Sequence, residues 1–253
     1  MVFGLARRLR PEPATAAVPR GLRVYAIGDV HGRLDLLDQL LNQIQHDAAS
    51  ARDLVKHLVF LGDYVDRGPN SRSVIDRLAG PPPSGFGAIH LMGNHEEAML
   101  DFMSDAPSGA NWLRYGGLAT LASYGVRPPE EDATPDHVDD ARRLLLANMP
   151  ASHKSFLKAL RTSVSIGDYH FVHAGIRPGM PLDRQERQDM LWIRDEFLNS
   201  NANHGKVVVH GHTISMKPDM HPNRIGIDTG AYATNRLTAL VLEGTERRFL
   251  CTV

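Results

Sequence analysis

One stretch of the chain, LVFLGDYVDRGPN at residues 58–70, limits what the protein can fold into. Four apolar residues typical of a buried strand lead directly into Gly62, Asp63, Asp66 and Arg67. A plain turn after a strand needs one Asp or Asn and a glycine. Two carboxylates and a guanidinium exceed that need, so we interpret this strand end as a candidate chemical site.

The first hundred residues alternate between strand and helix patterns. Leu34, Leu37, Leu41 and Ile44 follow helical spacing, whereas residues 57–61 form a short apolar run. The expected elements are strands at 23–30, 57–61 and 88–92 and helices at 33–48, 71–80 and 94–103. This βαβαβ order with short junctions predicts an α/β fold with helices on the faces of a sheet.

The remainder of the chain separates into a helical part and a β-rich part. Residues 104–162 carry helical patterns without a strand signal, and strand patterns resume after them. We expect residues 1–21 to form a mobile tail and residues 22–253 a single domain, with a helical insertion at about 104–162. The tail lacks the apolar segment of a signal peptide, and the chain has no apolar run of membrane-spanning length.

Composition narrows the expected partners and compartment. The formal net charge of −1 gives no electrostatic reason to expect nucleic acid or a membrane surface as a partner. The single cysteine, Cys251, excludes an internal disulfide and fits a reducing compartment, so we expect a cytoplasmic location. The oligomeric state is not predicted by any pattern in the sequence.

Five predicted strands end in polar motifs: GDVHG, GDYVDRG, GNHE, HAG and GHT, in that order. Open α/β sheets bind ligands at the carboxyl ends of their strands, so we expect these side chains to meet. The strand ends carry nitrogen- and oxygen-donating residues without a thiolate, among them Asp29, His31, Asp63, Asn94, His95, His173, His210 and His212. This set suits Mn²⁺, Fe²⁺ or Zn²⁺, and its size exceeds one tetrahedral site, which favours two ions.

These motifs resemble the metal-dependent phosphoprotein phosphatase (PPP) family of the calcineurin-like metallophosphoesterase superfamily. The similarity covers about residues 23–230, and NWLRYGG, TLASYG and LWIRD resemble the bacterial members. Those members include serine/threonine phosphatases and symmetrical diadenosine tetraphosphatases. The resemblance implies a sandwich of two mixed β-sheets flanked by helices, with a helical insertion between the third and fourth core strands.

The resemblance also implies a dinuclear metal centre, most readily with Mn²⁺. One ion would be held by Asp29, His31 and Asp63, and the other by Asp63, Asn94, His173 and His212. Asp63 would bridge the two ions. The nucleophile would then be a hydroxide between the ions that attacks the phosphorus in line, without a phosphoenzyme.

Further motif residues would act on the substrate. Asp66 would hydrogen-bond His95 and keep it ready to protonate the leaving oxygen, and Arg67 would bind two phosphate oxygens. Arg194 in LWIRD is a candidate second phosphate clamp, and an ion pair with Asp195 or Glu196 is the alternative.

Three other positions carry open questions. His210 shares a strand face with His212 but lies outside GHT, so we leave it out of the ligand set. Asp228 in IDTGAY has no assigned role, and packing at a strand end is its expected use. Ile214 stands where many phosphodiesterases of the superfamily have a further His ligand, which favours monoester or anhydride substrates. The C-terminal tyrosine motif of eukaryotic members is not recognisable.

The leading hypothesis is a hydrolase of phosphoserine and phosphothreonine in proteins, and the expected partner is a phosphorylated protein or a small phosphate ester. The alternative is a symmetrical diadenosine tetraphosphate hydrolase, in which Trp112 and Tyr115 would stack a base; otherwise both would pack in the core. A metal-binding scaffold without activity is disfavoured, because it would have no use for His95, Asp66 and Arg67.

Overall fold

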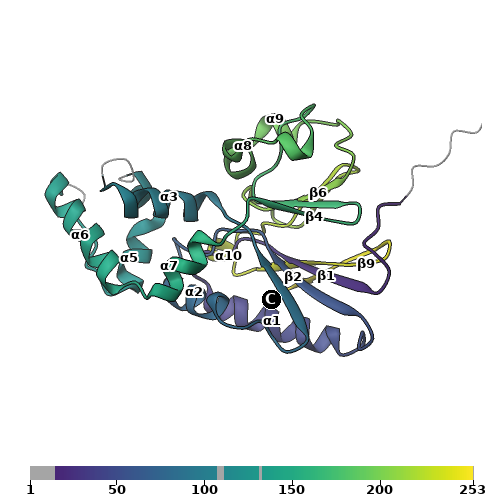
Figure 1. Cartoon of the computed structure of the whole chain (residues 1–253), viewed down its shortest axis with the longest axis horizontal. Helices are drawn as coiled ribbons and strands as arrows, with labels where there is room; N and C mark the ends of the chain where they lie inside the picture. Colours follow the sequence, from purple (N-terminus) through teal and green to yellow (C-terminus); the bar gives the residue numbers. More distant parts are fainter. Residues whose placement is uncertain (1–14, 107–110, 131–132, 253) are drawn as a thin grey trace, which may run out of the picture.

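The computed structural model describes residues 15–106, 111–130 and 133–252, and in these residues two β-sheets pack together between helices (Figure 1). The first sheet has the order β10-β9-β1-β2-β3 and the second the order β4-β5-β6-β8-β7. The strands are β1 (Leu22–Ile27), β2 (Val55–Phe60), β3 (Phe86–His90), β4 (Ser163–Ile166), β5 (Tyr169–Val172), β6 (Val207–His210), β7 (Asp219–Met220), β8 (Arg224–Gly226), β9 (Thr238–Glu243) and β10 (Glu246–Cys251). Parallel and antiparallel pairs occur in both sheets. The predicted sandwich of two mixed β-sheets is therefore confirmed.

The alternation of side chains along β1 explains the layers. Val24 and Ala26 lie in the core between the two sheets, whereas Tyr25 and Ile27 face the helices on the other side. The helix α1 (Leu34–Ala48) covers that side and contributes Leu37 among other leucines. On the outer face of the second sheet lie α8 (Arg187–Trp192) and α9 (Asp195–Leu198).

The segment between β3 and β4 is helical, as expected for the insertion at 104–162. Its helices gather at one end of the molecule in Figure 1. They are α3 (Asn94–Ser104), the π-helix η1 (Leu113–Gly117), α5 (Leu118–Ser123), α6 (Pro135–Asn148) and α7 (Ala151–Lys158). The remaining helices are α2 (Ser71–Ala79), the 3₁₀ helix η2 (Leu182–Arg184) and α10 (Ala231–Thr234).

Most predicted boundaries shift by one or two residues in the structure, and two differ further. The first strand ends at Ile27 and not at residue 30. The chain turns after Ile27, and His31 has a left-handed φ of 45°. The mobile tail predicted for residues 1–21 is too long: Val18 is buried and its amide donates to Gly244 O at 2.9 Å. Residues 1–14 of that prediction lie outside the described residues. No helix of the described segments is long and apolar enough to span a bilayer.

Candidate active site

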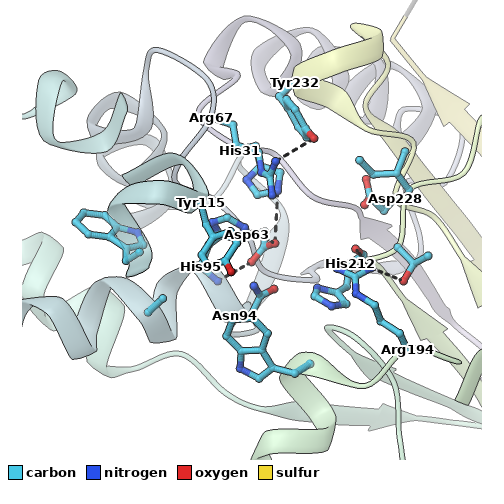
Figure 2. Close-up of a pocket in the computed structure, with 15 residues that line it drawn as sticks. His31, Asp63, Arg67, Asn94, His95, Tyr115, Arg194, His212, Asp228 and Tyr232 are labelled. Atoms are coloured by element: carbon cyan, nitrogen blue, oxygen red, sulfur yellow. Dashed lines mark hydrogen bonds and ion pairs between the residues drawn. The ribbon is translucent and has the colours of Figure 1, made fainter. Parts of the chain in front are cut away.

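A pocket of about 550 Å³ lies where strands of both sheets end (Figure 2). It is lined by His31, Asp63, Arg67, Asn94, His95, Ala98, Trp112, Tyr115, Trp192, Arg194, His212, Thr213, Ile214, Asp228 and Tyr232. Seven of the ten residues predicted for the site are in this lining. The other three, Asp29, Asp66 and His173, are buried and hydrogen-bond to members of it. The structure thus brings the whole predicted set together.

Asp63 stands between two groups of metal-ligating side chains. Its Oδ2 lies 3.5 Å from His31 Nε2 and 3.9 Å from His95 Nε2. Its Oδ1 lies 3.5 Å from His173 Nε2, which lies 3.2 Å from His212 Nδ1. One carboxylate therefore presents one oxygen to each group, so that both groups can share it.

The ligand atoms of these side chains carry free lone pairs that point toward one another, which is the arrangement that a cation needs. His173 Nδ1 donates to Leu61 O at 2.9 Å, so its Nε2 carries no proton. That Nε2 lies 2.9 Å from Asn94 Oδ1. His31 Nδ1 likewise donates to a backbone carbonyl at 2.9 Å. Asp29 Oδ1 is buried and has no hydrogen-bond partner among the described residues. These residues fit divalent cations, since buried polar atoms otherwise have partners.

The charges of the site lead to the same conclusion. Burial lowers the pKa of His31 to about 3 and also lowers the pKa of His173 and His212, so all three are neutral, as metal ligands must be. The pKa of Asp29 is raised well above its usual value by burial and by the charges of Asp228 and Asp63. A nearby positive charge stabilises the charged form of such a buried carboxylate, and cations in this pocket would supply that charge.

His95 is paired with a buried carboxylate. Its Nδ1 donates to Asp66 Oδ2 at 2.6 Å, and its Nε2 faces the group around Asp63 Oδ2. Burial acts to lower the pKa of His95, but the charge of Asp63 and the hydrogen bond to Asp66 outweigh burial and raise the pKa to about 9. A cationic imidazole cannot ligate a metal, whereas it can donate a proton into the pocket.

The loop after β2 holds a strained conformation that places Asp63. Asp63, Asp66 and Arg67 all have left-handed φ angles, of 53°, 72° and 66°. Such conformations cost about 1–2 kcal/mol per residue and persist only where the surroundings fix them. The loop also approaches α3 so closely that a Cβ on Gly93 would clash with Asp63 Oδ1.

The buried carboxylate of Glu96 fixes this loop. It accepts hydrogen bonds from the backbone amides of Asp63 and Tyr64 at 2.8 Å, Gly93 at 2.9 Å and Val65 at 3.2 Å. Burial and the charge of Asp63 raise the pKa of Glu96 to about 8, against the opposite effect of the amide donors. Glu96 belongs to the quoted GNHE motif, but sequence reasoning gave it no role.

Two arginines enter the pocket from different sides (Figure 2). Arg67 donates to Tyr232 Oη at 3.0 Å, with its guanidinium 4.7 Å from the centre of that ring. Arg194 donates to Thr213 Oγ1 at 3.1 Å and to His212 O at 3.3 Å. Among the described residues, Arg194 forms no ion pair with Asp195 or Glu196, the alternative considered above, and Glu196 pairs with Arg177 at 3.1 Å.

Asp228 and Tyr232, both from the IDTGAY segment, line the pocket. This corrects the expectation that Asp228 only packs at a strand end. Burial raises the pKa of Asp228 to about 6, and its Oδ1 accepts a hydrogen bond from Gly230 N at 2.8 Å. His210, in contrast, donates from Nδ1 to Gly211 O and packs against Phe197 away from the lining. The ring of Tyr232 meets that of His31 edge-on at 5.3 Å, a role that sequence reasoning missed.

The two aromatic residues of the insertion behave differently. Trp112 is 1% exposed, and Tyr115 is 62% exposed at the pocket. Of the two alternatives, packing in the core therefore holds for Trp112 but not for Tyr115. A third aromatic side chain, Trp192, is 38% exposed in the same lining and donates to Glu97 Oε2 at 2.8 Å. Sequence reasoning assigned nothing to Trp192, although it stands in the quoted LWIRD motif.

Residues 22–224 match the family described as calcineurin-like phosphoesterase. The asymmetrical bis(5'-nucleosyl)-tetraphosphatase PrpE of Bacillus thuringiensis is 28% identical over 239 residues, which cover 85% of this chain and 88% of that protein. Serine/threonine-protein phosphatase 1 of Salmonella typhimurium is 28% identical over 223 residues, with 85% and 89% covered.

Solved structures support the fold. A putative diadenosine tetraphosphatase superposes with a TM-score of 0.61 at 22% identity and 95% coverage of both chains. A cold-active protein tyrosine phosphatase superposes with a TM-score of 0.59 at 20% identity, covering 92% of this chain and 81% of that one. Both superpositions cover more than nine-tenths of this chain.

Proposed function

The chain belongs to the calcineurin-like phosphoesterase family, whose fold implies divalent metal ions bound by His and Asp residues, and on that premise we propose that it hydrolyses phosphomonoesters with two such ions. Phosphoserine and phosphothreonine in proteins are the first candidate substrates, and Mn²⁺ is the first candidate metal. One observation carries the proposal: the two oxygens of Asp63 face two different ligand groups, with His95 and Asp66 beside them.

The two ions would share Asp63. Asp29 and His31 complete the set for one ion, and Asn94, His173 and His212 complete the set for the other. When bound, the ions supply Lewis-acid chemistry that activates water and polarises the phosphoryl group. Ile214 lines the same pocket and has no atom that can ligate a metal, which favours a monoester or anhydride over a diester.

The chain's own residues would bind the phosphate and protonate the leaving group. The arginine forks of Arg67 and Arg194 match the geometry of phosphate oxygens. As water adds to phosphorus and the ester P–O bond breaks, the proton on His95 Nε2 passes to the leaving oxygen. Asp66 holds Nδ1 at 2.6 Å and stabilises the cationic ring before that transfer.

A second candidate, hydrolysis of a dinucleoside tetraphosphate, is favoured by the exposed aromatic side chains. Tyr115 and Trp192 both line the pocket and are 62% and 38% exposed. A nucleobase stacked on an aromatic ring gains about 1–3 kcal/mol. Trp112 is too buried to take part. Relatives named as tetraphosphatases add weight to this candidate.

Initial rates with saturating Mn²⁺ on a phosphothreonine peptide and on diadenosine tetraphosphate test the proposal. Faster peptide hydrolysis supports a protein phosphatase. Faster dinucleotide hydrolysis supports the second candidate, with two diphosphates from a symmetrical split or a triphosphate and a monophosphate from an asymmetrical one. Tyr115→Ala should then weaken dinucleotide hydrolysis alone, whereas the control Leu118→Ala, an exposed residue outside this lining, should change neither rate.

A further inference from the structure

Two side chains of the helical insertion bind the carboxylate of Asp66. Trp112 Nε1 donates to Oδ2 at 2.7 Å, and Thr120 Oγ1 donates to Oδ1 at 2.6 Å. His95 Nδ1 donates to the same Oδ2 as Trp112. Asp66, Trp112 and Thr120 are all buried. Side chains from both ends of the segment 112–120 therefore hold one carboxylate against His95.

The backbone of the same segment contacts the neighbouring residue, Arg67. The Arg67 amide donates to Gly116 O at 3.3 Å, within the π-helix η1. Gly116 has a φ of 118°, and a Cβ there would lie 2.9 Å from Arg67 N. This left-handed glycine lets the insertion approach the strained residues Asp66 and Arg67 directly.

We propose that Trp112 and Thr120 are positioning residues for phosphate hydrolysis, which hold the Asp66 carboxylate in the orientation that aims His95 at the leaving group. The proposal rests on the function proposed above, in which His95 is the proton donor. It assigns to the insertion a part in catalysis that acts through Asp66 and His95.

The geometry gives the reason. The last side-chain torsion of an Asp has a broad, two-fold energy profile, so hydrogen bonds decide how the carboxylate is turned. Donors on both oxygens fix that rotation, and Trp112 is itself fixed by Phe102, with ring centres 4.9 Å apart. If one of these two donors is removed, the carboxylate can rotate. His95 Nδ1 then no longer has an acceptor in the correct orientation.

Leaving-group dependence separates positioning from mere stability. A phosphoserine peptide expels a strongly basic alkoxide and needs the proton from His95, whereas p-nitrophenyl phosphate expels a weakly basic phenolate and needs it little. Loss of a hydrogen bond to a charged group typically lowers the rate or equilibrium constant that depends on it about 10-fold or more. We expect Trp112→Phe and Thr120→Val each to lower kcat about 10-fold on the peptide and at most about 3-fold on p-nitrophenyl phosphate.

A matched control comes from the same insertion. Tyr124 is buried and its hydroxyl hydrogen-bonds His153 Nδ1 at 2.8 Å, away from Asp66. Tyr124→Phe should leave the ratio of the two rates at its wild-type value, even if the protein is less stable. Thr120→Ser keeps the hydroxyl and should restore the ratio that Thr120→Val disturbs, which covers the case in which Trp112→Phe does not fold.

A double-mutant cycle with His95→Ala decides the mechanism. If Trp112 acts through His95, then Trp112→Phe should lower kcat on the peptide less than about 2-fold in the His95→Ala background. A full 10-fold loss there, or equal losses on both substrates in the single variant, would overturn the proposal. Unchanged peptide hydrolysis in His95→Ala alone would instead refute the proposed function.

Discussion

Glu96→Gln is the substitution whose effect can be worked out most directly from the structure. Each carboxylate oxygen accepts two backbone amides: Oε2 binds those of Asp63 and Gly93, and Oε1 those of Tyr64 and Val65. An amide side chain of the same shape keeps one oxygen and replaces the other with an NH₂ group. Whichever way it turns, two buried N–H donors lose their acceptor and face another donor.

The expected loss follows from that count. Each buried donor left without an acceptor costs about 1–3 kcal/mol, so Glu96→Gln should lower the free energy of unfolding by about 2–6 kcal/mol. Urea unfolding measures this, at a pH above the Glu96 pKa of about 8, where the wild-type carboxylate is ionised. The loop carrying Asp63 should loosen too, so metal affinity should fall with stability.

Glu97→Gln provides the control at the next position. Glu97 binds Arg187 at 2.7 Å and the Trp192 indole at 2.8 Å, both at partly exposed sites, so its replacement should cost about 1 kcal/mol or less. Equal effects of the two substitutions, or a loss below about 1 kcal/mol for Glu96→Gln, would refute the reasoning that the carboxylate fixes this loop.

Three shorter predictions concern His95, Arg67 and His90. His95→Ala should keep both ions and lower turnover about 100-fold or more, measured by metal analysis and by initial rates; unchanged turnover would remove His95 from its role. Arg67→Lys should lower kcat/KM about 10-fold because an ammonium cannot bind two phosphate oxygens as a fork, and an unchanged value would exclude that contact. Burial lowers the pKa of His90 to about 4, below the 6.5 of the unfolded chain. The unfolded state therefore binds a proton that the folded state does not, and the free energy of unfolding should fall as the pH drops from 6.5 to about 4. His90→Phe should flatten that part of the pH–stability curve.

The sequence allowed the metal site to be anticipated for a simple physical reason. The proposed ligands follow strands directly, and parallel strands such as β1, β2 and β3 bring the residues after them to one edge. Asp63 after β2 and Asn94 after β3 could therefore be placed together without knowing the second sheet. The choice of His212 over His210 needed the resemblance, because the alternation of a strand puts both side chains on one face.

Other features depended on contacts that no local pattern carries. Tyr232 is 165 residues from Arg67, and they meet only because β9 pairs with β1 and brings the preceding helix α10 to the pocket. The helical spacing around Trp112 predicts that its ring is buried. The same spacing does not indicate that the indole donates a hydrogen bond to Asp66. Val18 has no strand pattern around it, yet it is held by the turn between β9 and β10.

Metal analysis of wild type and Asp63→Asn tests the central claim most directly. Asp63 faces both ligand groups, so the wild type should bind two Mn²⁺ per chain and Asp63→Asn should lose affinity for both together. Asp228→Asn, which removes a buried pocket carboxylate from outside the two ligand groups, should keep both ions. An Asp63→Asn protein that loses one ion and binds the other as tightly as wild type would contradict a shared Asp63 and the dinuclear site built on it.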